Sequence, residues 1–296
     1  MQTREPKRTL SFTAPPQRVV CLVPSLTESL FDLGLGASLV GITDYCIYPA
    51  AGVAKLPRLG GTKNPDTAKI LALRPDLVIA NQEENTPETV QTLESNGLKV
   101  WVNFPKTLNQ SMDVLWLLVA IFQSHSAAQR LDTLQRTLDW VAAGAVEQPT
   151  WRYFCPIWQQ LETNPAWWMT FNRETYINDL LKLFGGINCF GDRQRRYPLQ
   201  ADLGQGESEP AAGRDTRYPR LELQEIIQAN PDVIILPSEP YNFQVSNVAE
   251  MAEIFTKTKA AQNGHIFWVD GSLLTWNGTR LGKALNELPQ ILKIVN

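Results

Sequence analysis

Aromatic side chains carry the most evident binding chemistry in this sequence. The 296 residues include nine tryptophans, and several aromatic residues follow short apolar runs that are typical of buried strands. In parallel α/β sheets, ligands bind outside the carboxyl ends of the strands. A flat ligand gains about 1 kcal/mol per ring pair beyond the area that it buries. We expect a ligand site among six of these residues, with core packing of each ring as the alternative: Tyr45, Tyr48, Trp158, Trp167, Trp168 and Tyr241.

The residue patterns of catalytic sites are missing. His125 and His265 are not in a zinc-binding spacing, so we expect no metal site built by protein ligands. No G-x-S-x-G, P-loop or G-x-G-x-x-G motif follows a predicted strand, which gives no basis for a hydrolase, an NTPase or a dinucleotide-binding protein. We therefore expect a protein that is not an enzyme and has no catalytic cofactor. The alternative, an enzyme that modifies its ligand, would have to use the carboxylates of Glu83, Glu84 and Glu239.

Composition and charge exclude several kinds of partner. Hydrophobic residues make up 44% of the chain and charged residues 19%, and the length suffices for two domains. The formal net charge of -3, with both signs interspersed, gives no basis for nucleic-acid binding. No run is long and apolar enough for membrane insertion, and residues 1–10 lack the following apolar core of a signal peptide. We expect a monomer in the cytoplasm, or in the periplasm if the start site is misassigned.

Strands and helices alternate in both halves of the sequence. In the first half, apolar runs predict strands at residues 19–23, 39–42, 77–80 and 98–102. In the second half they predict strands at residues 153–157, 233–236 and 266–269. A capping box at Ser25 and an N-cap at Asn64 predict the starts of two of the helices. This alternation is typical of α/β folds with parallel sheets.

A duplicated segment divides the chain into two similar lobes. Residues 70–80 read ILALRPDLVIA and residues 226–236 read IIQANPDVIIL, and both combine a helix end, a Pro-Asp pair and a buried strand. An apolar stripe over residues 126–145, capped by Ser126, predicts one helix of about 20 residues, which spans roughly 30 Å. The sequence thus predicts two Rossmann-like lobes joined by a single long backbone helix, with little lobe closure. The predicted boundaries are 1–106 for the first lobe, 107–148 for the helical linker and 149–296 for the second lobe.

Residues 193–217 differ in composition from the rest of the chain. They are rich in glycine, proline, arginine and glutamate and contain few apolar residues. A segment of this kind cannot bury enough apolar surface to become ordered by itself. We therefore expect a mobile loop whose deletion leaves the thermal stability nearly unchanged.

Several short motifs of the first lobe closely resemble those of one protein family. The motifs are VPSLTE (23–28), GITDY (41–45), YP (48–49), GG (60–61), NP (64–65) and ALRPDLVI (72–79). They resemble the helical-backbone metal receptors, the class III periplasmic binding proteins that deliver cobalamin and ferric siderophores to ABC importers. The resemblance is greatest to cobalamin-binding members, here without a signal peptide. It implies two lobes on one backbone helix and a tetrapyrrole-sized metal complex, such as a corrinoid, held in a cleft between rigid lobes.

The resemblance also implies site residues, one position at a time. Tyr45 matches the aromatic residue of the first cleft loop of the cobalamin binder, and Tyr218 matches the aromatic residue of the second lobe that faces the ligand. Met169 lies where that protein has phenylalanine, Thr62 where it has tryptophan, and Asp270 approximately at its acidic cleft residue. Together with the strand-end loops, the predicted ligand-binding residues are Tyr45, Tyr48, Gly60, Gly61, Thr62, Trp168, Met169, Tyr218, Glu239, Tyr241 and Asp270.

Partner and ligand alternatives remain open at this level. Exported members present one glutamate per lobe to the ABC permease, and the corresponding positions here are Ala68 and Gln224, which argues against a simple importer-feeding role. A ferric siderophore or haem is the alternative ligand. Siderophore anions would require Lys63 and Arg173 to face the ligand.

Overall fold

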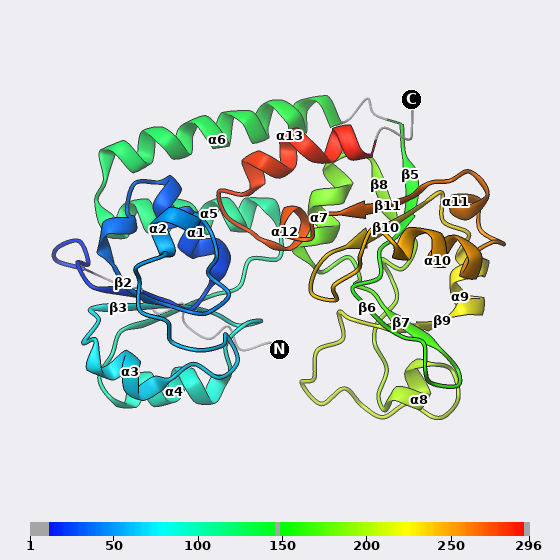
Figure 1. Ribbon diagram of the computed structural model, residues 1–296, viewed down its shortest axis with the longest axis horizontal. Coiled ribbons are helices and arrows are strands. Elements are labelled where there is room, and N and C mark those ends of the chain that lie inside the picture. The colour runs from blue at the N-terminus through cyan, green and yellow to red at the C-terminus, as the bar shows by residue number, and fades with distance from the viewer. Residues whose placement is uncertain (1–11, 146–148, 293–296) are drawn as a thin grey trace. The chain divides into compact units, whose positions relative to one another are not determined.

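The computed structural model describes residues 12–145 and 149–292, which fall into two compact units (Figure 1). Unit 1 consists of Met1–Pro105 and Ser111–Gln135, and unit 2 of Lys106–Gln110 and Arg136–Asn296. The N-terminal residues of the signal-peptide prediction and the predicted end of the linker at residue 148 lie outside the described residues.

Unit 1 is built on a parallel four-stranded sheet in the order β2-β1-β3-β4. Its strands are β1 (Val19–Cys21), β2 (Leu39–Ile42), β3 (Leu77–Asn81) and β4 (Val100–Asn103). Every residue of β1 and β3 is buried, because helices cover both faces of the sheet (Figure 1). The helices of unit 1 are α1 (Pro24–Asp32), α2 (Ala50–Val53), α3 (Thr67–Ala72), α4 (Pro87–Ser95) and most of α5 (Leu108–Phe122).

Two helix starts differ from the predictions. Helix α1 begins at Pro24 without a side-chain cap, so the capping box predicted at Ser25 is wrong. A proline at the first helical position has its φ angle fixed and needs no acceptor for an N–H, which allows an uncapped start. Helix α3 is capped by Asp66, whose carboxylate accepts a hydrogen bond from the Lys69 N–H at 3.0 Å, and not by Asn64.

Unit 2 contains a second parallel sheet, in the order β11-β10-β5-β8. Its strands are β5 (Trp151–Phe154), β8 (Gly186–Asn188), β10 (Val233–Pro237) and β11 (Ile266–Val269). The helices of this unit are α7 (Tyr176–Leu183), α8 (Leu199–Asp202), α9 (Leu223–Ala229), α10 (Asn247–Ile254), α11 (Lys259–Gln262), α12 (Ser272–Thr275) and α13 (Leu281–Ile291). The prediction of two α/β units with parallel sheets is confirmed.

A small antiparallel sheet in unit 2 was not predicted. It consists of β6 (Trp158–Gln160), β7 (Trp167–Met169) and β9 (Arg220–Glu222), in the order β6-β7-β9. Its strands have three residues each, which is too short for an alternating pattern to stand out in the sequence.

Helix α6 (His125–Gly144) carries the chain from unit 1 to unit 2, since Gln135 belongs to the first unit and Arg136 to the second. The long backbone helix predicted at residues 126–145 is therefore present. Its cap is Ser124 and not the predicted Ser126, because the Ser124 hydroxyl accepts a hydrogen bond from the Ala127 N–H at 3.2 Å.

The duplicated Pro-Asp pairs have the same structural role in both units. The Asp76 carboxylate accepts hydrogen bonds from the N–H groups of Gln17, at 2.8 Å, and Arg18, at 3.1 Å, directly before β1. In unit 2, the Asp232 carboxylate accepts a hydrogen bond from the N–H of Arg152 in β5 at 2.9 Å. Each aspartate thus satisfies backbone donors at the start of a neighbouring strand, which explains why the pair precedes a strand in both copies.

Candidate ligand-binding surfaces

The loop after β2 presents two tyrosines of unit 1. Tyr45 is 63% exposed and Tyr48 is 38% exposed. The loop is fixed below them, since the Thr43 hydroxyl and the Cys46 thiol are buried and lie 3.1 Å apart. The Arg58 guanidinium donates hydrogen bonds to the carbonyl groups of both residues, at 2.9 and 2.8 Å. The two rings therefore stand on an anchored loop and face solvent.

The glycine-rich loop of unit 1 lies beside Tyr45. Gly60 has a φ angle of +85°, which favours glycine, and its carbonyl accepts a hydrogen bond from the Asp44 N–H at 2.9 Å. A Cβ atom at Gly61 would lie 3.7 Å from Tyr45 Cε2, so the two loops are in van der Waals reach. Thr62 follows and is half-buried. The structure thus brings together four predicted site residues of unit 1 at the carboxyl end of its sheet.

One face of the antiparallel sheet in unit 2 combines aromatic, thioether and cationic side chains. We call it the outer face; its two rows are Trp158, Met169 and Arg220, and Gln160, Trp167 and Glu222. Cross-strand partners lie on the same face, so Met169 lies between Trp158 and Arg220. Trp158 is 41% exposed, and its ring meets the Tyr241 ring edge to face with centroids 5.4 Å apart. Met169 and Tyr241, both predicted site residues, therefore both lie beside Trp158.

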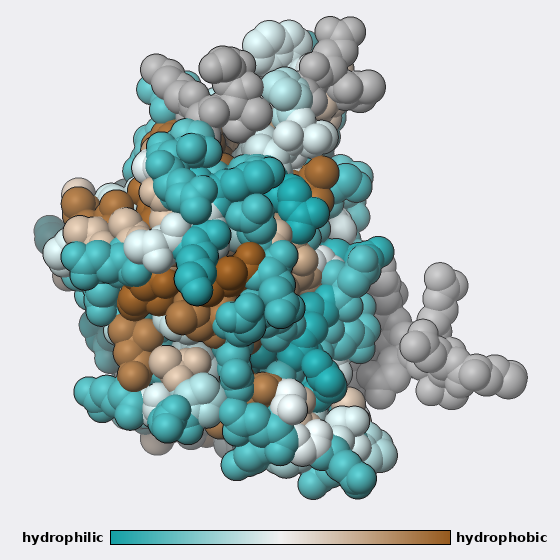
Figure 2. Space-filling view, turned by 90° about the vertical axis from the view of Figure 1, so that its right-hand side faces the viewer, coloured by the Kyte–Doolittle hydropathy of each residue, from teal (hydrophilic) through white to brown (hydrophobic). Residues whose placement is uncertain are grey.

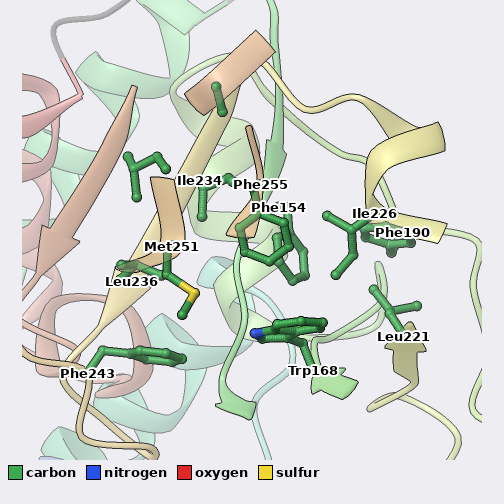
Figure 3. Close-up of a cluster of buried hydrophobic side chains, with 12 residues drawn as sticks. Phe154, Trp168, Phe190, Leu221, Ile226, Ile234, Leu236, Phe243, Met251 and Phe255 are labelled. Atoms are coloured by element: carbon green, nitrogen blue, oxygen red, sulfur yellow. The ribbon is translucent and has the colours of Figure 1, made fainter. Parts of the chain in front are cut away.

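Trp168 lies on the opposite side of this sheet, in the core of unit 2 (Figure 3). It is 1% exposed, and its ring centroid lies 5.1 Å from that of Phe255. Side chains alternate between the two faces of a strand, so Trp167 and Met169 take the outer face and Trp168 takes the core. The prediction that Trp168 lines the ligand site assumed a loop here, and the structure corrects it to a core residue.

Tyr218 lies two residues before β9 and is half-buried. The Arg217 guanidinium carbon lies 5.0 Å from the centre of the Tyr218 ring, and the Tyr218 carbonyl accepts a hydrogen bond from Arg220 Nη1 at 3.2 Å. The Thr170 N–H donates a hydrogen bond to the Pro219 carbonyl at 3.0 Å, which extends the pairing of β7 and β9. Tyr218 is therefore positioned at the margin of the outer face.

Glu239 and Asp270 lie at the carboxyl ends of the neighbouring strands β10 and β11. The Thr275 hydroxyl donates a hydrogen bond to Glu239 Oε1. Burial raises the pKa of Glu239, and the nearby Asp270 carboxylate raises it further. Gly271 allows this close arrangement, because a Cβ atom there would lie 2.6 Å from Glu239 Cγ. A carboxyl group that is protonated more readily can donate a hydrogen bond to a carbonyl oxygen of a ligand.

Sequence reasoning missed two arginines near these residues. Arg280 is 5% exposed and donates a hydrogen bond to the Ser272 hydroxyl at 2.8 Å, and that hydroxyl donates to Asp270 Oδ1 at 2.7 Å. Arg220 was missed because its place on the outer face follows from the pairing of β7 with β9, and no signal in the sequence indicates that pairing.

Exposure alone does not locate a ligand surface on this protein. Figure 2 shows hydrophobic residues exposed among hydrophilic ones on one face. In unit 2, Val245 is 66% exposed and Trp268 is 37% exposed, and neither residue was predicted to bind. The outer face is distinguished by the grouping of side chains that suit one kind of ligand, and not by the exposure of any single ring.

In residues 12–145 and 149–292, no group of three or more histidine, cysteine, aspartate or glutamate side chains could hold a metal ion. In the same part of the chain, no helix has the length and apolarity that crossing a membrane requires.

The chain is similar to known proteins in sequence and in fold. The vitamin B12-binding protein of Vibrio cholerae serotype O1 is 31% identical over 186 residues, which are 62% of this chain and 64% of that protein. The match thus spans less than two thirds of that relative. The vitamin B12-binding protein of Vibrio vulnificus (strain CMCP6) is 25% identical over 88% of this chain and 84% of its own length.

Solved structures share the fold. The periplasmic vitamin B12-binding protein BtuF of Vibrio cholerae superposes with a TM-score of 0.74 at 22% identity, covering 95% of this chain and 98% of that one. The periplasmic heme-binding protein RhuT of Roseiflexus sp. RS-1 gives 0.70 at 21% identity, covering 95% and 99%. The family model described as periplasmic binding protein matches residues 19–273. This chain therefore belongs to the periplasmic binding protein family.

Proposed function

We propose that this protein is a non-enzymatic substrate-binding protein for a corrinoid, the class of metal complex that includes cobalamin. The observation that carries the proposal is the pairing of Trp158 and Met169 on the outer face of unit 2, with the Tyr241 ring 5.4 Å from that of Trp158. Aromatic rings and a thioether suit the flat, apolar face of a tetrapyrrole-sized macrocycle. The exposed Tyr45 in unit 1 offers a further ring at a strand end. The names of the relatives, vitamin B12-binding proteins, support the same ligand class.

Polar groups of unit 2 fit the periphery of such a ligand. A corrin ring carries neutral amide side chains, whose carbonyl oxygens accept hydrogen bonds. Because burial raises the pKa of Glu239, its carboxyl group is protonated more readily than an exposed glutamate and can act as the donor. Asp270 completes the polar part of the proposed surface of unit 2. In unit 1, the proposed ligand contacts besides Tyr45 are Tyr48, Gly60, Gly61 and Thr62.

Haem is the second candidate ligand, and a ferric siderophore is less well supported. The siderophore alternative requires Lys63 and Arg173 as cations for the ligand. Lys63 Nζ donates a hydrogen bond to the Glu83 carbonyl, and Arg173 forms an ion pair with Asp192, so both cations already have partners in their own unit. Haem carries two carboxylates, and Arg220 on the outer face would suit one of them. Haem-binding proteins also share the fold.

An ABC permease is the proposed partner, docked without the usual glutamate pair. Ala68 and Gln224 are each the second residue of their helices, α3 and α9, and both are exposed. The nearest acidic side chains are engaged within their own unit, Asp66 with Lys69 and Glu225 with Arg193. A permease would therefore have to recognise neutral side chains at these two positions.

Equilibrium binding tests this function. Purified full-length protein is titrated with cyanocobalamin, dicyanocobinamide, haem and a ferric siderophore, and binding is followed by calorimetry and by the absorbance of the ligand. We expect saturable 1:1 binding of a corrinoid in the micromolar range or tighter, which corresponds to about 8 kcal/mol or more. Saturable binding of haem alone would establish the second candidate, and binding of none of the four would refute both.

A further inference from the structure

Two half-buried arginines of the segment 193–220 form no ion pair with a carboxylate of the described residues, whereas three other arginines of the segment do. In the segment 193–220, Arg193 forms ion pairs with Asp202, at 3.1 Å, and with Glu225, at 2.9 Å. Arg214 is paired with Glu209 at 3.4 Å, and Arg217 with Asp215 at 2.6 Å. Among the residues that the structure describes, no carboxylate forms an ion pair with Arg195 or Arg220. Arg196 lacks one too, but it is exposed and therefore hydrated.

Arg195 and Arg220 are both half-buried and close enough to affect each other. Burial lowers the pKa of Arg220, and the positive charge of Arg195 lowers it further. Two like charges that are partly removed from water destabilise a site unless an opposite charge approaches them. The negative charge of Asp202 partly offsets this lowering of the Arg220 pKa, but the Asp202 carboxylate is committed to hydrogen bonds from Arg193 Nη1 and from the N–H groups of Arg196 and Arg220.

Aromatic rings hold the two guanidinium groups in place. The Arg195 guanidinium carbon lies 4.2 Å from the centre of the Tyr197 ring, and Tyr197 is 8% exposed. The Arg220 guanidinium carbon lies 5.9 Å from the centre of the Trp167 ring, on the outer face. Arg220 Nη1 donates to the Tyr218 carbonyl, which fixes the group further. A fixed, planar guanidinium is well suited to bind an oxyanion.

We propose that Arg195 and Arg220 form an anion-binding subsite at the margin of the outer face, which binds one oxyanion of the ligand. The chemistry is that of a phosphodiester or a carboxylate. In a cobalamin the anion is the phosphodiester of the nucleotide loop, and in haem it is a propionate carboxylate. The assignment of the anion to the ligand of the outer face rests on the proposed function, because Met169 and Arg220 are cross-strand partners there. The proposal that Arg195 and Arg220 bind an anion does not rest on the proposed function.

The first arm of the test uses inorganic phosphate and needs no tetrapyrrole. The melting temperature of the parent should rise with millimolar phosphate relative to chloride at equal ionic strength. Arg220→Gln and Arg195→Gln should each remove most of that rise. Arg214→Gln is the matched control, because it removes an arginine of the same segment that already has an acidic partner. If phosphate does not stabilise the parent, or stabilises all four proteins equally, the subsite does not exist.

The second arm measures the affinity for cyanocobalamin, for dicyanocobinamide, which lacks the phosphodiester, and for haem. Loss of one charge-assisted hydrogen bond should weaken binding about tenfold or more. Arg220→Gln and Arg195→Gln should show this loss for cyanocobalamin and not for dicyanocobinamide if the anion is the phosphodiester. A loss for haem only identifies the carboxylate as the anion.

The outcomes separate this proposal from the proposed function. Phosphate stabilisation that depends on the arginines, without binding of any tetrapyrrole, supports the subsite and refutes the function. Tight cobalamin binding that all variants retain, without an arginine-dependent phosphate effect, supports the function and overturns the subsite. Because Arg195 lies outside the strands, Arg195→Gln keeps the test decisive even if Arg220→Gln impairs folding.

Discussion

The Asp202 carboxylate and the Arg193 guanidinium form an ion pair at 3.1 Å in the interior of unit 2. Asp202 is 1% exposed, and its oxygens also accept the N–H groups of Arg196 and Arg220, both at 2.8 Å. This aspartate thus ties the segment of residues 193–217 to strand β9. Tyr197 and Ala201 of the same segment are buried as well. The prediction of a mobile loop is therefore wrong: the segment is ordered by polar contacts and a few buried side chains.

Replacing Asp202 should destabilise the protein strongly. Asp202→Ala leaves two backbone donors without their acceptor and leaves Arg193 with Glu225 as its remaining acidic partner, and removing one partner of a buried ion pair costs about 3–5 kcal/mol. The free energy of unfolding, from urea denaturation, measures this loss. Glu209→Gln is the control, since Glu209 is exposed and its ion pair contributes about 1 kcal/mol at most. Equal, small losses in both variants would mean that the segment is a dispensable loop after all.

The parallel sheets could be predicted because their strands are buried on both faces. Residues of β3 and β10 are buried throughout, so each strand reads as a continuous apolar run, and a Pro-Asp pair marks its start. The order of residues 193–217 could not be predicted from composition, because it depends on the contacts of Asp202 with Arg193 and Arg196, which precede it, and with Arg220 of β9, which follows it. Long-range polar contacts of this kind leave no periodic trace in a sequence.

Site residues in loops could be predicted from the sequence, and those in the short strands could not. Tyr45 follows the easily recognised strand β2, and the structure places it on the surface beside Gly61. Trp168 was assigned to the wrong side because three residues of β7 do not reveal which face is covered. For the same reason Arg220 escaped notice. How the predicted residues bind a ligand stays a prediction, which the following variants test.

Replacing two tryptophans, one at a time, tests which face of the antiparallel sheet is core and which is surface. Trp168→Ala should lower the free energy of unfolding by about 3–5 kcal/mol, because it empties a well-packed core position. Trp158→Ala, at a residue that is 41% exposed, should cost far less stability and should weaken corrinoid binding. Denaturation and calorimetric titration of both variants measure the two effects. The opposite pattern, with binding lost at Trp168 and stability lost at Trp158, would contradict the assignment of the two faces.

Tyr45 is the residue of unit 1 with which the ligand hypothesis can best be tested. Since its ring is 63% exposed, Tyr45→Ala should leave the urea midpoint nearly unchanged. Removal of an aromatic anchor should weaken corrinoid binding by about 1–3 kcal/mol. Trp140→Ala on α6 is the control, because Trp140 is 79% exposed and was not predicted to bind. A Tyr45 variant that is destabilised yet binds like the parent would identify the ring as a structural residue.

Glu239 should make the stability of the protein depend on pH above the ordinary glutamate pKa of 4.5. Burial raises its pKa above the ordinary value of 4.5, so the folded state holds a proton that the unfolded state releases at lower pH. Between these two pKa values the folded state binds more protons, and the free energy of unfolding must therefore fall as the pH rises. Below pH 4.5 both states are protonated, and the stabilisation relative to high pH is fully present.

Glu239→Gln should flatten this dependence. Glutamine is neutral at every pH, and its side-chain oxygen can still accept the hydrogen bond from the Thr275 hydroxyl. We expect the variant to be at least as stable as the parent at alkaline pH and to lack the decline in stability that the parent shows as the pH rises above 4.5. Urea midpoints across this range measure the effect, with Glu253→Gln as an exposed control. A decline of the same size in the parent and in Glu239→Gln would show that another group is responsible, and stability that rises with pH would contradict the raised pKa.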